Sequence, residues 1–224
     1  MDNTELPYYL ALHFTSGIGS KRLITLCQYF GSAERAFKAS AQDLLHVPGI
    51  GKGITDAFVL DRDAAFEEAQ KQLAKLSEEM SIVTYYDEAY PELLKSTYSP
   101  PPLLFVRGNA ELLHEERMIA VVGSRKTSDY GRRAAQEFSQ GFVKEKVTVV
   151  SGFAKGIDTA AHVAAFEAGG NTIAVLGSGV DVIYPSTNKT FANELVSSGR
   201  GATVSSAEWR VRRSSSKAKC RAAR

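Results

Sequence analysis

Cysteine and histidine are scarce in this sequence. Its 224 residues include two cysteines, Cys27 and Cys220, which lie far apart in the chain, and four histidines. This scarcity argues against a disulfide framework and against a structural zinc site, and the cysteine usage favours a reducing cytoplasm. Metal or disulfide staples are therefore not expected to organise the fold.

Long hydrophobic runs are missing as well. No stretch approaches the ~20 apolar residues that span a bilayer, and the apolar part of residues 1–14 has no basic segment before it, as a secretory signal would. We therefore expect a cytoplasmic protein with no membrane partner. The hydrophobic and charged fractions, 44% and 23%, are typical of globular domains.

The folded part of the chain also lacks an excess of positive charge. The formal net charge is +2, but residues 208–224 hold seven Lys/Arg and one acidic residue, Glu208. Residues 1–207 keep 20 of the 27 basic and 24 of the 25 acidic side chains, which is a net charge of −4. Overall basicity is therefore no evidence for nucleic-acid binding, and the positions of individual charges must decide.

Residues 1–76 have helical periodicity and contain a repeat. Gly-Ile-Gly occurs at 17–19 and at 49–51, each time between a turn and an apolar-periodic helix. Such glycines permit a tight hairpin and leave the amides of the next helix N-terminus unpaired. The repeat resembles a helix-hairpin-helix or SAM-like unit, which can hold a DNA phosphate. A helical bundle whose glycines only turn corners is an equal alternative.

Two further regions precede the main domain. Apolar side chains at spacings of three and four predict an amphipathic helix over 61–80. Residues 81–87 are β-branched and aromatic, and a proline-rich stretch at 99–102 leads into another extended run, so 77–117 is predicted to be a connector with strand-like pieces.

From residue 118 short apolar runs alternate with helical segments. The predicted strands are 118–122, 147–150, 172–176 and the start of a fourth at 202–205, and the predicted helices are 130–144, 156–168 and 187–198. This order predicts an α/β fold, with a Rossmann-like parallel sheet covered on both faces over 118–205. Right-handed crossovers would bring its strand-to-helix turns to the carboxyl edge.

Each of the first three predicted strands is followed by a Gly-Ser or Ser-Gly turn, at 123–124, 151–152 and 177–178. Glycine lets a ligand approach the backbone, serine adds a hydroxyl, and helix N-termini supply N–H groups with partial positive charge. Open α/β sheets bind ligands at this edge. The turns therefore predict an anion site.

Positive side chains accompany these turns. Between residues 118 and 160 seven Lys/Arg stand against four Asp/Glu. Arg125, Lys126 and Lys155 lie within the turns, and Arg125 is expected to point into the crevice because it follows the glycine turn directly. Arg132 and Arg133, at the start of the first predicted helix, are interpreted as solvated surface charges.

Standard nucleotide and catalytic motifs are absent. Residues 51–53 read Gly-Lys-Gly, which fails the Walker A pattern, and 177–182 lacks the third glycine of a dinucleotide fingerprint, so no cofactor is expected. Asp158 and His162 lie four residues apart and could form an acid–base pair. The favoured interpretation places Asp158 in a first helical turn and His162 against the sheet.

The turns belong to longer segments, which cover about 85–204. The segments read YYDEAYPELLKSTYSPPPLLFVRGN, IAVVGSRKTSDYG, VVSGFAKGIDTAAH and AVLGSGVDVIYPSTN. In this order they resemble the signature blocks of the DNA-processing protein A (DprA/Smf) family. The resemblance implies an extended Rossmann domain, often preceded by a small SAM-like or helix-hairpin-helix domain. It also implies a cytoplasmic homodimer that binds single-stranded DNA without known catalysis and loads RecA recombinase in natural transformation.

The resemblance also assigns site residues. It makes the G-S-R turn at 123–125 a contact for DNA phosphate, places 151–152 and 155–156 in the same pocket, and puts Ser178 and Tyr184-Pro185 on its rim. With the turn cation Lys126, the predicted DNA-binding residues are Gly123, Ser124, Arg125, Lys126, Ser151, Gly152, Lys155, Gly156, Ser178 and Tyr184.

After residue 205 the sequence departs from the family pattern. The family would continue with further DNA-contacting segments, whereas residues 206–224 read SAEWRVRRSSSKAKCRAAR and show no strand or helix periodicity. We expect a disordered basic tail on a C-terminally truncated sheet, from a shifted frame or a truncated gene. A native tail with nucleic-acid affinity, in which Trp209 stacks on a base, is the alternative.

Three functions stay open at this point. The leading prediction is a non-enzymatic recombination mediator that protects incoming single-stranded DNA and helps to load RecA. The second is a nucleotide-processing enzyme similar to the phosphoribohydrolases of this fold type, although the P-G-G-x-G-T-x-x-E glutamate of those enzymes is missing from 177–185. The third is a non-functional remnant, suggested by the atypical segment after residue 205.

Overall fold

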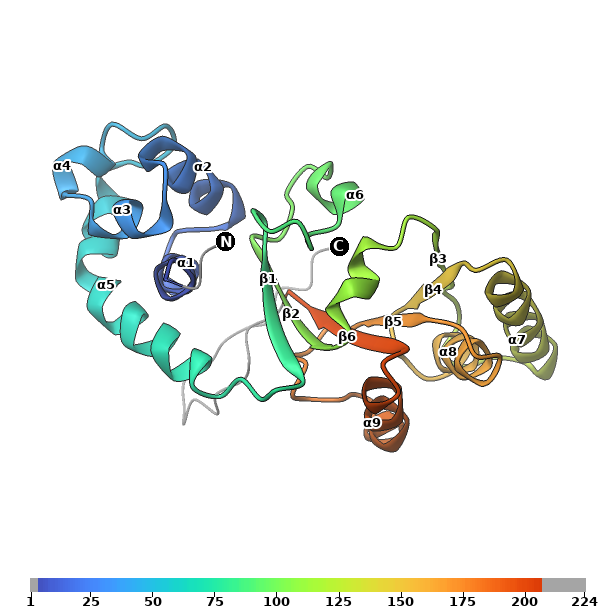
Figure 1. Cartoon of the computed structure of the whole chain (residues 1–224). Coiled ribbons are helices and arrows are strands. Elements are labelled where there is room, and N and C mark those ends of the chain that lie inside the picture. The colour runs from blue at the N-terminus through green and yellow to red at the C-terminus, as the bar shows by residue number, and fades with distance from the viewer. Residues whose placement is uncertain (1–3, 207–224) are drawn as a thin grey trace.

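Helices fill the first third of the chain in the computed structural model, which describes residues 4–206 (Figure 1). They are α1 (Leu6–Phe14), α2 (Ser20–Phe30), α3 (Ala33–Lys38), α4 (Ala41–Leu44) and α5 (Lys52–Leu73). Local chemistry sets several ends: left-handed Gly31 closes α2, the Ser32 hydroxyl caps α3, and Ser40 forms a capping box with Asp43.

The two Gly-Ile-Gly segments form matching turns in front of α2 and α5. Gly17 and Gly49 both have φ of +81°, and Gly19 and Gly51 are the N-cap residues of the two helices. The Arg22 guanidinium donates to the carbonyls of Gly17 and Gly49, at 2.9 and 3.0 Å, and so links the turns. The repeat is therefore structural, while a helix-hairpin-helix role in DNA binding stays a prediction.

The helix predicted over 61–80 is wrong at both ends. α5 runs without a break from Lys52 to Leu73, and Met80 already belongs to a strand, where it pairs with Arg107. Leu76 and Met80 keep a helical spacing, but pairing with a distant strand overrides that local pattern. Periodicity alone could not reveal this.

Six strands form one sheet in the order β1-β2-β6-β5-β4-β3. Their bounds are β1 (Met80–Thr84), β2 (Leu103–Gly108), β3 (Met118–Ala120), β4 (Thr148–Ser151), β5 (Thr172–Val175) and β6 (Gly201–Ser205). Strands β3 to β6 are parallel, and β1 and β2 join them antiparallel. The predicted α/β fold is confirmed, and residues 77–117 contribute two strands to the same sheet, with α6 (Glu92–Lys95) between them.

All three long crossover helices lie on one face of this sheet (Figure 1). They are α7 (Asp129–Lys144), α8 (Ile157–Glu167) and α9 (Lys189–Ser197), the last preceded by the short 3₁₀ helix η2 (Ser186–Asn188). Successive parallel strands are direct neighbours, so every right-handed crossover turns toward the same side. The opposite face is covered by a second 3₁₀ helix, η1 (Ala110–His114), whose buried Leu112 and Leu113 pack against the sheet.

The helical region and the sheet share a hydrophobic core. Leu103 and Phe105 of β2 cluster with the buried residues of α1 to α5. The buried Tyr9 hydroxyl of α1 donates to the Pro102 carbonyl at 2.8 Å, and burial raises the pKa of Tyr9 above its usual range. The N-terminal helices therefore pack directly on β2 and the loop before it.

Two predictions concern the limits of the described region. Among residues 4–206, no helix has the length and apolar character required to cross a bilayer. The predicted tail, with Trp209, lies outside the described residues except for Ser206.

Candidate nucleic-acid interface

The first two predicted turns touch at the carboxyl edge of the sheet. The Ile157 amide at the start of α8 donates to the Ser124 carbonyl at 3.2 Å. Gly156, with φ of +91°, lies so close to this turn that a Cβ would collide with the Ser124 oxygen and the Arg125 carbonyl group. Glycine at position 156 is therefore required by the contact between the loops.

The short helix η2, which follows the loop after β5, is fastened to the second turn by one buried side chain. Asn188 of η2 is 6% exposed, and its amide donates to the Phe153 carbonyl at 3.0 Å and to the Thr159 hydroxyl at 2.9 Å. The Thr159 hydroxyl in turn donates to the Ala154 carbonyl at 2.7 Å. Because β3, β4 and β5 are neighbouring parallel strands, the three turns that follow them lie at one edge of the sheet, as predicted.

The serine hydroxyls of the three turns donate their protons to backbone carbonyls and so stabilise the loops. Ser124 and Ser178 each donate to a carbonyl in their own loop, at 2.8 and 2.6 Å. Ser151 is buried and donates to the Val121 carbonyl at 2.6 Å, which ties β4 to the end of β3. The helix cap of α7 comes instead from Ser128, whose hydroxyl accepts from the Gly131 amide.

The glycines of the first two turns also serve packing. A Cβ at Gly123 would collide with the Ile157 side chain, and a Cβ at Gly152 would lie 2.8 Å from the Asp158 carboxylate. Both glycines are themselves exposed. Their small size thus brings the loops together, in addition to any close approach by a ligand.

The predicted cations remain available at this edge. Arg125, Lys126 and Lys155 are exposed, and within residues 4–206 no carboxylate forms an ion pair with any of them. Tyr184 is also on the rim loop and is 71% exposed, just before the buried Pro185. The edge therefore presents these cations and the ring of Tyr184 to solvent.

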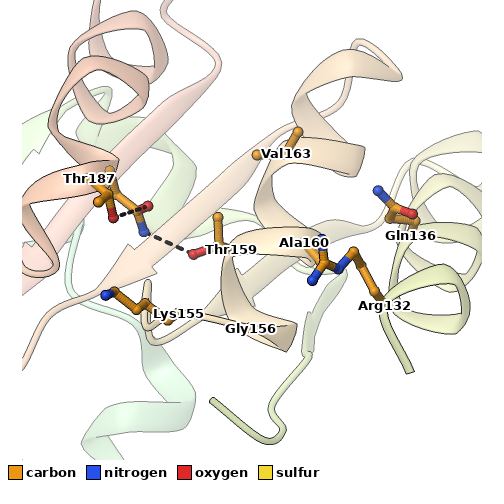
Figure 2. A pocket seen from close by; sticks show the side chains of 9 residues that line it. Arg132, Gln136, Lys155, Gly156, Thr159, Ala160, Val163 and Thr187 are labelled. Atoms are coloured by element: carbon orange, nitrogen blue, oxygen red, sulfur yellow. Dashed lines mark hydrogen bonds between the residues drawn. The ribbon is translucent and has the colours of Figure 1, made fainter. Parts of the chain in front are cut away.

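A cavity of about 350 Å³ lies beside the second turn, between α7, α8 and η2 (Figure 2). Its lining residues are Arg132, Gln136, Lys155, Gly156, Thr159, Ala160, Val163, Thr187 and Asn188. The lining thus contains two cations and no carboxylate. Of the ten predicted site residues, Lys155 and Gly156 line it. Ser151 is the last residue of β4, and the other seven lie on the neighbouring loops.

Arg132 is exposed, which agrees with its interpretation as a solvated charge, but Arg132 and Gln136 also line this cavity and are not among the ten predicted site residues. They are four residues apart and so share one face of α7, and this spacing is the signal that could have found them. Whether Arg132 or its neighbour Arg133 faces the cavity depends on the rotation of α7 against α8, which the sequence does not reveal.

Asp158 and His162 have separate structural partners. The Asp158 carboxylate accepts from the Ala154 amide at 3.3 Å. His162 is fully buried, and its Nδ1 lies 2.6 Å from the Thr172 hydroxyl. That hydroxyl donates to the Val149 carbonyl at 2.8 Å, so Thr172 links the ring to β4. Burial lowers the pKa of His162 to about 4, which keeps the ring neutral and agrees with the favoured structural interpretation.

Comparison with known proteins identifies the family. Residues 81–221 match the family model described as DNA recombination-mediator protein A, and this match extends beyond residue 205, where the sequence was predicted to leave the family pattern. The chain is 35% identical over 206 residues to protein Smf of Synechocystis, covering 89% of this chain and 50% of that protein. It is 36% identical over 174 residues to DNA processing protein DprA of Streptococcus pneumoniae, covering 78% and 58%.

Solved structures agree with this assignment. The X-ray structure of DprA from Streptococcus pneumoniae matches with a TM-score of 0.66 at 31% identity, over 90% of this chain and 67% of that one. A DprA structure from Helicobacter pylori, whose title describes a single-stranded DNA binding mode, matches with a TM-score of 0.51 at 25% identity, over 58% and 56%. The chain spans between half and three fifths of the length of the two curated relatives above. It belongs to the DNA recombination-mediator protein A family, known as DprA or Smf.

Proposed function

We propose that this chain binds single-stranded DNA at the carboxyl edge of its sheet, through Arg125, Lys126 and Lys155 and through the backbone of the joined turns. The observation that carries this proposal is the convergence of cations from two loops, which have no carboxylate partner among residues 4–206. The bond between the Ile157 amide and the Ser124 carbonyl holds these loops together. Cations at helix N-termini suit the phosphates of a polynucleotide. The single-stranded DNA binding stated for the Helicobacter pylori relative supports the choice of ligand.

Within this proposal the predicted site residues divide by role. Arg125, Lys126 and Lys155 contact phosphates, and exposed Tyr184 offers a ring on which a base can stack. The glycines and serines of the turns keep the loops in place through the contacts described above. Binding of this kind is largely independent of base sequence and weakens as salt rises.

The wider role is proposed from the family. The chain would act as a cytoplasmic, non-enzymatic recombination mediator, which protects incoming single-stranded DNA and helps RecA to load, and would work as a homodimer. The structural roles of Asp158 and His162 support a binding protein over a phosphoribohydrolase.

The test compares Arg125, which lies in the first turn, with Arg133, which lies in α7 outside the turns. Arg125→Ala should weaken binding of a fluorescent oligo-dT by about tenfold, the size expected for a charge-assisted hydrogen bond, while Arg133→Ala should leave it near the wild-type value. Fluorescence anisotropy at fixed salt measures both. Equal affinities of the two variants would remove the role of the turn.

A further inference from the structure

The cavity between α7 and α8 has a positively charged side chain on each of two sides, and one of the two comes from a helix and not from the turns. Arg132 and Gln136 project from one face of α7, and Lys155 lies on the opposite side, in the loop before α8 (Figure 2). Between them Ala160 and Val163 of α8 contribute apolar surface. Positive charge thus lies at two ends of a small, partly apolar space.

Two polar residues that line this cavity, Asn188 and Thr159, already form hydrogen bonds within the protein. Both amide protons of Asn188 are used by Phe153 and Thr159, and the Thr159 hydroxyl proton is used by Ala154. These groups fix the shape of the cavity and have little capacity left for a ligand. Polar recognition therefore falls mainly to Arg132, Gln136 and Lys155.

We infer that one nucleotide of a bound single strand occupies this cavity, so that α7 forms a second wall of the DNA site. This inference rests on the proposed function. The phosphates on either side of the nucleotide contact Arg132 and Lys155, its base packs against Ala160 and Val163, and the Gln136 amide faces the base edge. The volume of about 350 Å³ is near the lower end of the ~300–1,000 Å³ of small-ligand sites, and thus suits one such unit.

The geometry also explains why DNA should use one arginine of the adjacent pair. Arg132 and Arg133 are both exposed and both near the start of α7. Arg132 lines the cavity with Gln136, one helical turn later, and Arg133 does not. Arg133 is therefore a matched control, with the same charge on the same helix.

The experiment titrates fluorescein-labelled oligo-dT with the full chain over a series of salt concentrations. Arg132→Ala should weaken binding about tenfold and reduce the slope of log affinity against log salt by ~0.7, the value for one phosphate contact on a single strand. Gln136→Ala should weaken binding without a change of slope. Arg133→Ala should match the wild type in both quantities, and circular dichroism should confirm that all variants are folded.

The outcomes separate this inference from the proposed function. If Arg125→Ala weakens binding while Arg132→Ala and Arg133→Ala behave alike, the second wall is wrong and the turns keep their role. If Arg132→Ala is weaker but its salt slope is unchanged, the contact with phosphate is wrong. A wild-type chain that does not bind oligo-dT overturns both proposals.

Discussion

Glycine-rich turns in front of helices occur in two regions of this molecule, and the two regions use their cations differently. In the N-terminal hairpins, Arg22 is engaged by the carbonyls of two turns, and the Lys21 ammonium lies 3.4 Å from the centre of the Tyr98 ring. At the carboxyl edge of the sheet, Arg125 and Lys155 have no carboxylate partner among residues 4–206. A cation beside a glycine turn is therefore a candidate for binding only where the fold leaves it unengaged, and this condition is necessary but not sufficient, because Lys52 beside Gly51 is exposed as well.

The largest expected effect is a difference in stability between substitutions at two glycines with positive φ, one from each region. Gly156→Ala should lower the free energy of unfolding by about 3 kcal/mol, because backbone strain adds to the collision with the neighbouring loop. Gly49→Ala should lower it by about 1 kcal/mol, because its φ is equally unfavourable but a Cβ there would have open space around it. Urea unfolding followed by circular dichroism measures both. Equal losses would show that the contact between the turns is not as tight as described.

The second effect concerns the two histidines whose pKa is lowered to about 4 by burial, His13 in the helical region and His162 under the sheet. The unfolded chain takes up these protons near pH 6.5 and the folded chain only near pH 4, so stability falls as the pH decreases through this window. For His162 the loss between pH 6.5 and 5 should be about 2 kcal/mol. His13, whose pKa is lowered to the same value, should add a loss of similar size.

Urea unfolding at pH 7 and pH 5 tests this expectation. His162→Gln and His13→Gln should each remove about half of the difference in stability between the two pH values, because their pKa shifts are of equal size. If wild-type stability is unchanged at pH 5, the two rings are not neutral in the folded protein.

The smallest expected effect concerns DNA affinity and compares one lysine from each region. Lys155 and Lys52 are both exposed and both adjoin a glycine N-cap, of α8 and α5 respectively. Lys155→Ala should weaken oligo-dT binding by up to about tenfold, and Lys52→Ala should leave it nearly unchanged, as measured by anisotropy. A loss at Lys52 as large as that at Lys155 would make the N-terminal hairpins a DNA site in their own right.

Much of the fold could be read from the sequence because its signals are local. The predicted strand at 172–176 and the helix at 130–144 agree with β5 and α7 to within one residue, since short apolar runs and a 3.6-residue period reflect direct burial. The helix predicted over 61–80 failed because Met80 pairs with a strand that lies 27 residues further along the chain.

Some features of the candidate site could likewise be predicted from the sequence, and others could not. Its loops and cations were predictable, because parallel strands with right-handed crossovers must bring their turns to one edge. The use of the serine hydroxyls inside the loops was not, because it depends on which carbonyl lies nearest after folding.

The sequence by itself determined the α/β order, the three turns and the charges placed on them, since each depends on neighbours close in the chain. Only the tertiary structure decided that Arg132 rather than Arg133 lines the cavity, and that the N-terminal helices share a core with β2. Both depend on the way in which separate elements rotate and pack against one another, and the free energy of that packing is distributed over side chains far apart in the sequence.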